Sequence, residues 1–575
     1  MVDSSTVAAR NEWSETTLLA KIQMMSKLKS LDAARIGRWL GPVLFLVLLI
    51  VPTPDGMSAQ GQRLLAVTAL MSTFWLTQAM PIAATSLIPV VAFPFLGIQT
   101  SDVVSQAFIN KQVFLFLGGF IIALGIERWG LHERLALHIV RVLGTSLKRV
   151  ILGFMLATAF LSMWISNTAS TLLMTPIGIA LVVSLQKSLA KSTGTLVPGT
   201  EASDRIERDG PLGAFAISLM LGIAWSASIG GLTTLVGTVT NVQFQAIWEK
   251  QFPLAPELSA GDWLVAFGPV GLAMLGISWW LLTWRMPVPK AGSVERSFFT
   301  SRLKELGSPT KAEWAMLGVF LTTAFLWTFR KPLAFGEGGF QIPGWQSIVN
   351  WFLVEKLGAT EEFARKSVHD STVAVLMALV MFVIPVRKKE DGKPEFLMDW
   401  ETAQRLPWAI LLLVGGGLAI AGAFKETGLA EWVGGTFAAS AEGWPVWALI
   451  LGICFLMTFL TEFATNMVIV TVMLPVLADA ALKLQMDPRL LMLPATVSAS
   501  CAFMLPIGTP PNAIVFSSGV LTMSDMAKRG FVLNLVGVIF MTLATWFYLV
   551  PALGLSSDDV PEWAEKPPPP KVATE

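Results

Sequence analysis

Long apolar runs constrain the fold of this chain more than any other feature, because most of them can cross a lipid bilayer. A membrane-spanning helix needs about 20 predominantly apolar residues. Only 14% of the residues are charged and 54% are hydrophobic, whereas a soluble domain carries roughly 25% charged residues. The sequence therefore predicts an all-α polytopic membrane protein with about eleven transmembrane helices. We expect crossings near residues 37–53, 62–80, 82–98, 112–142, 213–248, 262–285, 312–330, 371–386, 407–440, 489–521 and 530–553.

Four short polar motifs interrupt the apolar runs, two in each half of the chain. Ser-Asn-Thr at 166–168 and Gly-Thr-Val-Thr-Asn at 237–241 lie in the first half, and Thr-Asn-Met at 465–467 and Gly-Thr-Pro-Pro-Asn at 508–512 lie in the second. An unsatisfied polar group in hydrocarbon costs several kcal/mol, so such breaks persist only where protein, water or a ligand satisfies them. Paired breaks in two halves are typical of a transporter's binding site near the middle of the bilayer.

Two further apolar segments, 149–186 and 444–482, are too long for one simple crossing and carry the asparagine motifs near their middles. We interpret them as re-entrant hairpins with the motifs at their tips, because irregular backbone at membrane depth must line a cavity or contact protein. Two helices joined by a buried polar kink are the alternative. At the other two motifs, glycine and proline favour unwound helices, and a kink that binds nothing is the alternative.

The two halves repeat the same order of elements. Leu-Gly-Gly at 117–119 followed by Gly-Leu at 130–131 matches Gly-Gly-Gly at 415–417 followed by Gly-Leu at 428–429. Each glycine-rich helix precedes an asparagine-bearing hairpin and then a broken helix. Because each copy makes about five crossings, an odd number, the second copy enters the membrane upside down, which predicts an inverted repeat around a midplane site.

Loop charge indicates the orientation. The expected inside loops are basic, as the positive-inside rule requires, and the tail is more acidic. We therefore expect the N-terminus to be cytoplasmic and the C-terminus extracytoplasmic, in the inner membrane of a bacterium. The predicted parts are a cytoplasmic N-terminal segment (1–36), a first transmembrane helix (37–61), a first repeat (62–285), a cytoplasmic linker (286–311), a second repeat (312–553) and an extracytoplasmic proline-rich tail (554–575).

The four motifs offer helix ends, hydroxyls and amides rather than formal charges. Helix N-termini carry partial positive charge and can hold a carboxylate, while exposed carbonyl and amide oxygens suit Na⁺. Hydroxyls that bond back to their own helix are the alternative at Ser166, Thr168 and Thr465. Gln78 and Glu462 also lie in apolar context, and for both we favour a structural role over a place in the site.

Other function classes are disfavoured. The chain has two cysteines and three histidines, too few for a disulfide framework or a His/Cys metal cluster. It shows no paired acids and no nucleophile with a base, so we expect no enzyme activity. No basic face suggests a nucleic-acid partner.

At its motifs the chain resembles the divalent anion:sodium symporter family, which includes sodium-coupled dicarboxylate and citrate carriers. The resemblance runs from about residue 38 to 553. It is carried by Met-Trp-Ile-Ser-Asn-Thr at 163–168, Ser-Ile-Gly-Gly-Leu-Thr-Thr-Leu at 228–235, Thr-Glu-Phe at 461–463 and Gly-Thr-Pro-Pro-Asn-Ala-Ile-Val at 508–515.

The resemblance implies a homodimer in the lipid bilayer, in which a transport domain moves against a scaffold domain as an elevator. It implies two or more Na⁺ sites, with the substrate between them. The first Na⁺ site would use Ser162, Ser166, Asn167 and Gly237, and the second Thr461, Ala464, Asn466 and Gly508. A small organic anion would meet Ser166, Asn167, Thr168, Thr238, Thr465, Asn466, Met467, Thr509 and Pro510.

The chain departs from the family pattern at three places. The second tip ends in Met467 where the family has a hydroxyl, the first break reads Val239-Thr240 in place of two prolines, and Gln78 stands where an acid is frequent. We expect Na⁺-coupled symport of a di- or tricarboxylate such as succinate, malate or citrate. A Na⁺-independent exchanger, a sulfate or sulfonate carrier, and a passive anion channel are the alternatives.

Overall fold

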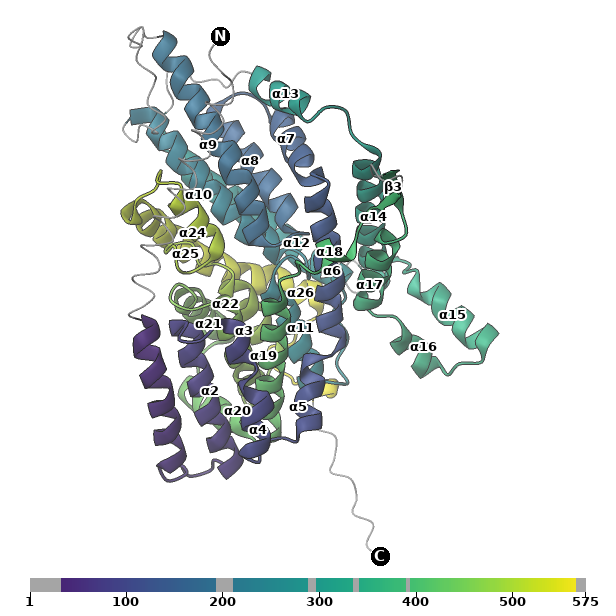
Figure 1. Cartoon of the computed structure of the whole chain (residues 1–575). Coiled ribbons are helices and arrows are strands. Elements are labelled where there is room, and N and C mark those ends of the chain that lie inside the picture. The colour runs from purple at the N-terminus through teal and green to yellow at the C-terminus, as the bar shows by residue number, and fades with distance from the viewer. Residues whose placement is uncertain (1–32, 193–209, 288–295, 335–340, 389–392, 565–575) are drawn as a thin grey trace, which may run out of the picture.

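The computed structural model describes residues 33–192, 210–287, 296–334, 341–388 and 393–564. Most of the predicted N-terminal segment, part of the linker and the run of four prolines at 567–570 lie outside these residues. The fold is a bundle of helices (Figure 1). Only two short antiparallel strand pairs occur in the described part, β1 (Leu333–Ala334) with β2 (Gln341–Ile342) and β3 (Pro385–Lys388) with β4 (Pro394–Phe396). The predicted all-α class is thus confirmed.

The helices of the first half begin with one over Ala33–Ile50. It is followed by α2 (Ala59–Thr77), α3 (Ile82–Ser86), α4 (Ile88–Phe95), α5 (Ser101–Phe108), α6 (Lys111–Arg128), α7 (Leu131–Leu143), α8 (Leu147–Ser162), α9 (Asn167–Ser192), α10 (Gly210–Leu232), α11 (Val239–Gln251), α12 (Ala260–Thr283) and α13 (Arg296–Glu305).

The second half continues the helical order. It contains α14 (Lys311–Thr328), α15 (Gln346–Leu357), α16 (Glu361–Ser367), α17 (Asp370–Met381), α18 (Trp400–Ala403), α19 (Trp408–Glu426), α20 (Leu429–Ala441), α21 (Val446–Leu460), α22 (Asn466–Lys483), α23 (Arg489–Ala499), α24 (Pro510–Ser517), α25 (Met523–Ala544), a π-helical turn (Thr545–Leu549), α26 (Val550–Leu553) and a 3₁₀ turn (Glu562–Ala564).

Eight helices of the described part are long and apolar enough to cross a membrane. Others are shorter because the chain breaks them. Each of the four crossings that the glycine and polar motifs interrupt is split into two helices: α6 and α7, α10 and α11, α19 and α20, and α23 and α24. The structure thus supports a helical membrane protein, while the exact number of crossings stays a prediction.

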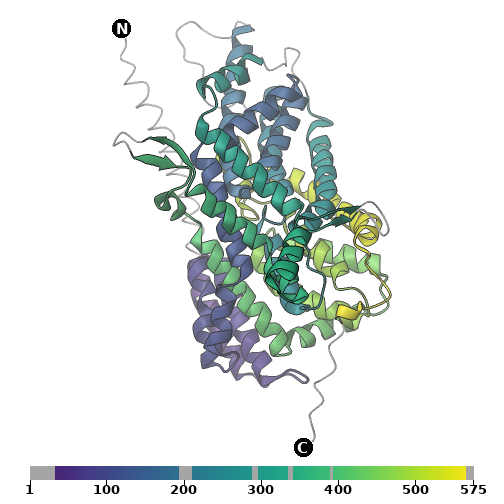
Figure 2. The ribbon, with the colours of Figure 1, turned by 90° about the vertical axis from the view of Figure 1, so that its right-hand side faces the viewer.

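One expected crossing is shorter than its apolar run. The run at 371–386 predicts a helix to its end, but α17 stops at Met381 and Pro385–Lys388 forms β3. Proline has no N–H to continue the helix, and β3 finds its backbone partners in β4 instead. Between α14 and α17 the chain also forms α15 and α16, which the sequence does not predict. They extend away from the bundle in Figure 1, on the side that faces the viewer in Figure 2.

The repeat is visible in local geometry. Helices α7 and α20 have 13 residues each, and each follows a glycine in the left-handed region, Gly130 at φ 67° and Gly428 at φ 73°. Only glycine adopts this conformation without strain. Helices α7 and α20 lie toward opposite ends of the molecule (Figure 1), and the inverted repeat itself stays a prediction.

The core surrounds α10, which is buried over nearly its whole length. Helices α8, α9, α12 and α24 pack against it, and α11 packs against α19, α22 and α23. Helices from both halves therefore meet around the break between α10 and α11, which brings the polar motifs of the two halves into one region.

Candidate functional site

The first tip lies between α8 and α9. Helix α8 ends at Ser162 and α9 begins at Asn167. The Ser162 hydroxyl lies 2.6 Å from Asn167 Oδ1 and 2.7 Å from the carbonyl oxygen of Ala227. Ser166 caps the next helix, because its Oγ accepts the N–H of Ala169 at 3.2 Å. The tip is therefore held both by its own hydroxyls and by α10.

The first break lies between α10 and α11 and is held by Asn241. Its Nδ2 lies 3.1 Å from the carbonyl oxygen of Gly231 and 2.7 Å from that of Thr234. The Thr234 hydroxyl donates to the carbonyl oxygen of Met163 in the first tip and accepts the N–H of Gly237 at 3.1 Å. These contacts join the first break to the first tip.

Two glycines permit this close approach. A Cβ added to Gly231 would lie 2.2 Å from Asn167 Oδ1, and one added to Gly237 would lie 2.5 Å from the carbonyl oxygen of Gly231. Real Cβ atoms do not come this close to other heavy atoms, so a side chain at Gly237 would collide with backbone and one at Gly231 would push the Asn167 amide aside. The asparagine of the tip thus rests directly on the backbone of α10.

The second break has the same internal bracing. Asn512 Nδ2 donates to the carbonyl oxygens of Ala502 at 3.1 Å and Leu505 at 3.0 Å, ten and seven residues before it. The contacts of Asn241 with Gly231 and Thr234 also span ten and seven residues.

The residues before the two helices also match. Thr238 has φ −141° and ψ 149°, and Thr509 has φ −141° and ψ 148°. The two breaks therefore share both the backbone conformation of the threonine and the side-chain contacts of the asparagine that follows it.

Glu462 joins the second break to the second tip. Its side chain is 1% exposed. It accepts the N–H groups of Met504 at 2.8 Å and Leu505 at 2.9 Å, and the Asn534 amide at 2.6 Å. A Cβ added to Gly508 would lie 3.0 Å from Glu462 Oε2. These contacts fit the structural role that the sequence favours for this acid.

Several buried acceptors around the motifs lack a hydrogen-bond partner among the described residues. They are Asn241 Oδ1, Asn466 Oδ1, Asn512 Oδ1 and Thr509 Oγ1. A buried unpaired polar atom costs about 1–3 kcal/mol, so these oxygens are available to a cation or a polar ligand.

The other predicted site residues differ in how accessible they are. Ala464 and Met467 are buried. The Thr461 hydroxyl lies 2.9 Å from the carbonyl oxygen of Met457, one turn earlier, so it is bonded back to its own helix. Thr168, Thr238 and Thr465 are half-buried and Pro510 is exposed. Gln78 ends α2 in a left-handed conformation, which agrees with a structural role.

All four motifs lie at helix N-termini. Helices α9, α11, α22 and α24 begin at Asn167, Val239, Asn466 and Pro510. Helix α24 packs against α9 and α10, and α11 packs against α22, so the two halves meet at these ends. The sequence missed the braces Asn241, Asn512 and Asn534, although the first two close the quoted motifs and repeat at the same offset from the glycine.

Comparisons with known proteins find a matching family and relatives over most of the chain. The family described as the sodium:sulfate symporter transmembrane region matches residues 32–553. The chain is 37% identical over 525 residues to the sodium-dependent dicarboxylate transporter SdcS of Staphylococcus saprophyticus, which covers 90% of this chain and 92% of that protein. SdcS of Staphylococcus aureus is 36% identical over the same length.

The YdaH transporter of Alcanivorax borkumensis has a solved structure that matches with a TM-score of 0.49 and 12% identity, over 77% of this chain and 86% of that chain.

Apolar helices that break at paired polar motifs define an integral membrane transport protein rather than an enzyme. The chain belongs to the sodium:sulfate symporter family, whose model covers nearly all of its described residues. The predicted resemblance to divalent anion:sodium symporters is thereby confirmed.

Proposed function

We propose that this protein is a secondary transporter that couples Na⁺ to the movement of a dicarboxylate across the membrane. The name of the SdcS relatives, 36–37% identical over 90% of the chain, supports Na⁺ coupling and a dicarboxylate substrate. The observation that carries the proposal is the meeting of four uncharged helix N-termini with buried, unpaired oxygens.

Na⁺ would bind at the two tips. Unwound backbone carbonyls and amide oxygens coordinate Na⁺ in transporters with broken helices. The first site would use Ser162, Ser166, Asn167 and Gly237, and the second Thr461, Ala464, Asn466 and Gly508. The unpaired Asn466 Oδ1 supports the second site. The contacts of Asn167 with Ser162 and Gly231 support a first site that is shaped before the ion arrives.

The dicarboxylate would lie between the tips. The N-terminal ends of α9, α11, α22 and α24 carry partial positive charge, which attracts a carboxylate without the desolvation cost of a buried lysine. Its contacts would come from Ser166, Asn167, Thr168, Thr238, Thr465, Asn466, Met467, Thr509 and Pro510. Na⁺ at both tips would offset the charge of the substrate, and this mutual attraction is the physical basis of the coupling.

In this mechanism the tips and breaks move together as a transport domain against the remaining helices, in a homodimer with the N-terminus in the cytoplasm. The re-entrant character of α8–α9 and α21–α22 belongs to the same proposal. It is supported by the non-helical residues at both tips.

Uptake into proteoliposomes tests the function. Radiolabelled succinate should accumulate when an inward Na⁺ gradient is imposed and should not when K⁺ replaces Na⁺. Malate should compete and sulfate should not. Equal uptake without Na⁺ would instead support an exchanger, competition by sulfate alone would support a sulfate carrier, and flux without saturation would support a channel.

A further inference from the structure

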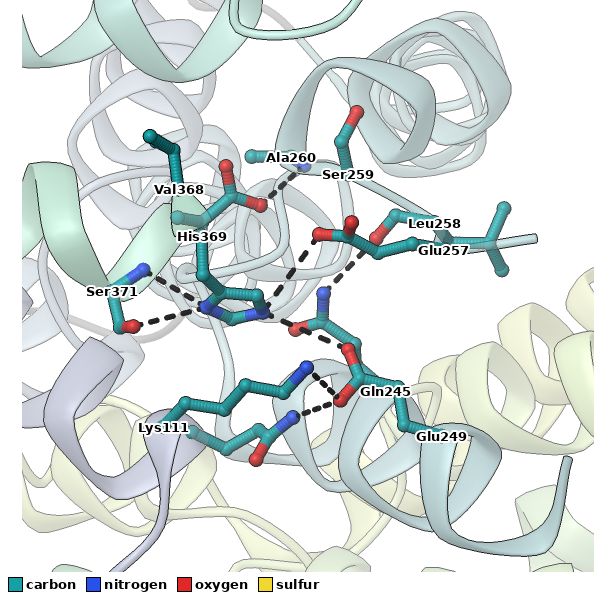
Figure 3. A network of polar contacts seen from close by, with 12 residues as sticks. Lys111, Gln245, Glu249, Glu257, Leu258, Ser259, Ala260, Val368, His369 and Ser371 are labelled. Atoms are coloured by element: carbon teal, nitrogen blue, oxygen red, sulfur yellow. Dashed lines mark hydrogen bonds and ion pairs between the residues drawn. The ribbon is translucent and has the colours of Figure 1, made fainter. Parts of the chain in front are cut away.

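A second polar cluster lies away from the tips, where the end of α11 meets the start of α17 (Figure 3). Glu249 is in the last turn of α11, Glu257 is in the segment before α12, and His369 precedes α17. Glu249 lies ten residues beyond the start of α11, about 15 Å along the helix at 1.5 Å per residue. The cluster is therefore separate from the proposed transport site.

Three ligand atoms converge in this cluster. His369 Nε2 lies 3.6 Å from Glu249 Oε1 and 3.8 Å from Glu257 Oε1, and all three atoms lie within 4.8 Å of one another. These distances are too long for hydrogen bonds. They exceed by a few tenths of an ångström the roughly 3.3–3.4 Å that separates ligand atoms around tetrahedral zinc with bonds of about 2.0–2.1 Å.

The converging atoms include two that are buried without a hydrogen bond among the described residues, His369 Nε2 and Glu249 Oε1. His369 is only 8% exposed. Gln245, one turn earlier on α11, has an unpaired buried Oε1, and its amide is turned toward the same gap in Figure 3. Leaving buried polar atoms unpaired costs about 1–3 kcal/mol each, so the gap favours a ligand.

We propose that Glu249, Glu257 and His369 form a binding site for a divalent transition-metal ion of the zinc type, with Gln245 Oε1 or water as the fourth ligand. One imidazole and two carboxylates are a donor set that suits zinc. Nothing in the transport site needs this ion, so its role is separate from that of Na⁺.

The histidine can change tautomer to accept the ion. His369 Nδ1 accepts the N–H of Ser371 at 3.1 Å. Ligation by Nε2 needs the ring proton on Nδ1, which would then donate to the Ser371 hydroxyl 3.0 Å away and no longer accept the N–H of Ser371. Metal-bound histidines usually donate their other N–H to such an oxygen.

Neighbouring cations compete with a metal ion for the two carboxylates, and Arg330 already bonds one proposed ligand atom, Glu257 Oε1. Lys111 bonds Glu249 through Oε2 at 2.8 Å, and Lys331 bonds Glu257 through Oε2 at 2.9 Å, whereas the Oε1 atoms face His369. Lys111 is half exposed and can turn to solvent. Arg330 stays bound to buried Asp370 at 2.6 Å and shares Glu257 Oε1.

The same cations keep one ligand ready. Burial of Glu257 opposes ionisation, but the charges of Arg330 and Lys331 outweigh it and lower the pKa of Glu257 to about 2. Glu257 is therefore a carboxylate at every physiological pH.

The site would join two parts of the molecule. Glu249 lies in the last turn of α11, the helix that follows the first break, whereas His369 precedes α17, which packs on α6 and α14. A bound ion would tie these parts together and stop the elevator motion. This consequence rests on the proposed function, whereas binding of the ion does not.

Zinc binding to the purified full-length protein tests the site, by competition with a chromophoric zinc chelator. We expect one Zn²⁺ per chain. Glu249→Gln and His369→Asn should each weaken binding at least about 10-fold. Asparagine is chosen because it caps a helix well and so preserves the start of α17. Lys111→Met should strengthen binding about two- to five-fold, since it removes a competing exposed ion pair.

The chain's other histidines provide matched controls. His132→Gln and His138→Gln should leave zinc affinity unchanged, because both side chains contact backbone oxygens elsewhere. Equal zinc binding by wild type and His369→Asn, or weaker binding by Lys111→Met, would overturn the site.

The transport consequence has its own readout. Zn²⁺ should inhibit Na⁺-driven succinate uptake by wild type but not by Glu249→Gln, and a chelator should restore it. Zinc binding without inhibition would contradict the proposed effect of the ion on transport but would still support the metal site. Zinc binding by a protein that takes up no anion would overturn the proposed function alone.

Discussion

The two tips of the molecule share one plan but are held by different chemistry. In the first half, the hydroxyl of Thr234 bonds the tip and so joins the break to it. The N–H of Thr233, the first residue after α10, still donates to the carbonyl oxygen of Gly230 within α10. In the second half, Glu462 receives the N–H groups of Met504 and Leu505. Every buried N–H needs a hydrogen-bond acceptor. In the second half a buried carboxylate supplies the acceptor that a helical carbonyl would otherwise provide.

The difference follows the extent of unwinding. Only residues 233–238 separate α10 from α11, whereas residues 500–509 separate α23 from α24. A longer break frees more backbone donors, and a carboxylate accepts more hydrogen bonds than a hydroxyl. The shape of the second tip therefore depends on one acid, Glu462. The shape of the first tip depends on Gly231, which leaves room for Asn167.

The largest expected effect is the loss of either tip asparagine. Asn167→Ala and Asn466→Ala should each reduce Na⁺-driven succinate uptake at least about 100-fold, because each removes an amide proposed to meet both ion and substrate. Initial uptake rates check this, with Asn350→Ala in α15 as a distant control. Normal uptake in both variants would contradict the assignment of the site. Normal uptake in one variant would show that ion and substrate bind mainly at the other tip.

The next effect separates the two anchors. Glu462→Ala should lower the free energy of unfolding by about 3 kcal/mol or more, because it leaves two partly buried N–H groups and the buried Asn534 amide without this acceptor. Thr234→Val, which removes the hydroxyl that bonds the Met163 carbonyl oxygen in the first tip, should cost only about 1 kcal/mol. Thermal unfolding in detergent compares them, and similar losses would show that the second tip has no special dependence on its acid.

Gly231→Ala tests the dependence of the first tip on glycine. The added methyl group would displace the Asn167 amide, so we expect Na⁺ affinity to fall about 10-fold, or roughly 1.4 kcal/mol. The matched change Ala502→Gly in the second break should alter it less than about two-fold. Na⁺ titration of thermal stability measures both, and an unchanged Na⁺ affinity in Gly231→Ala would contradict the close fit.

The shared braces should behave alike. Asn241→Asp and Asn512→Asp each replace the donating amide with an acceptor, so each should cost about 1–3 kcal/mol of unfolding free energy. The two losses of unfolding free energy should agree within about 1 kcal/mol, since each amide bonds the carbonyl oxygens ten and seven residues before it. A large cost in only one break would contradict the equivalence.

Met467→Thr should have the smallest effect. It restores a hydroxyl at the second tip, and we expect the KM for succinate to change about two- to five-fold, with little change in stability. Competition by succinate, malate and citrate measures the preference. An unchanged order among these anions would show that Met467 does not determine substrate choice.

The sequence determined the family, the helical class and the four places where helices break. These follow from local chemistry: apolar runs must be helical in a bilayer, and glycine, proline and short polar residues mark where helices stop. Helices α9, α11, α22 and α24 begin within the quoted motifs, which confirms the predicted positions of the breaks.

Only the tertiary structure decided what holds those breaks. The contacts of Glu462 with Asn534, of Thr234 with Met163, and of His369 with two glutamates join residues tens to more than a hundred positions apart. No spacing in a single sequence specifies such pairs, because they depend on how whole helices pack. Packing also set the end of α17 at Met381, where pairing between β3 and β4 replaced the helix that the apolar run alone predicts.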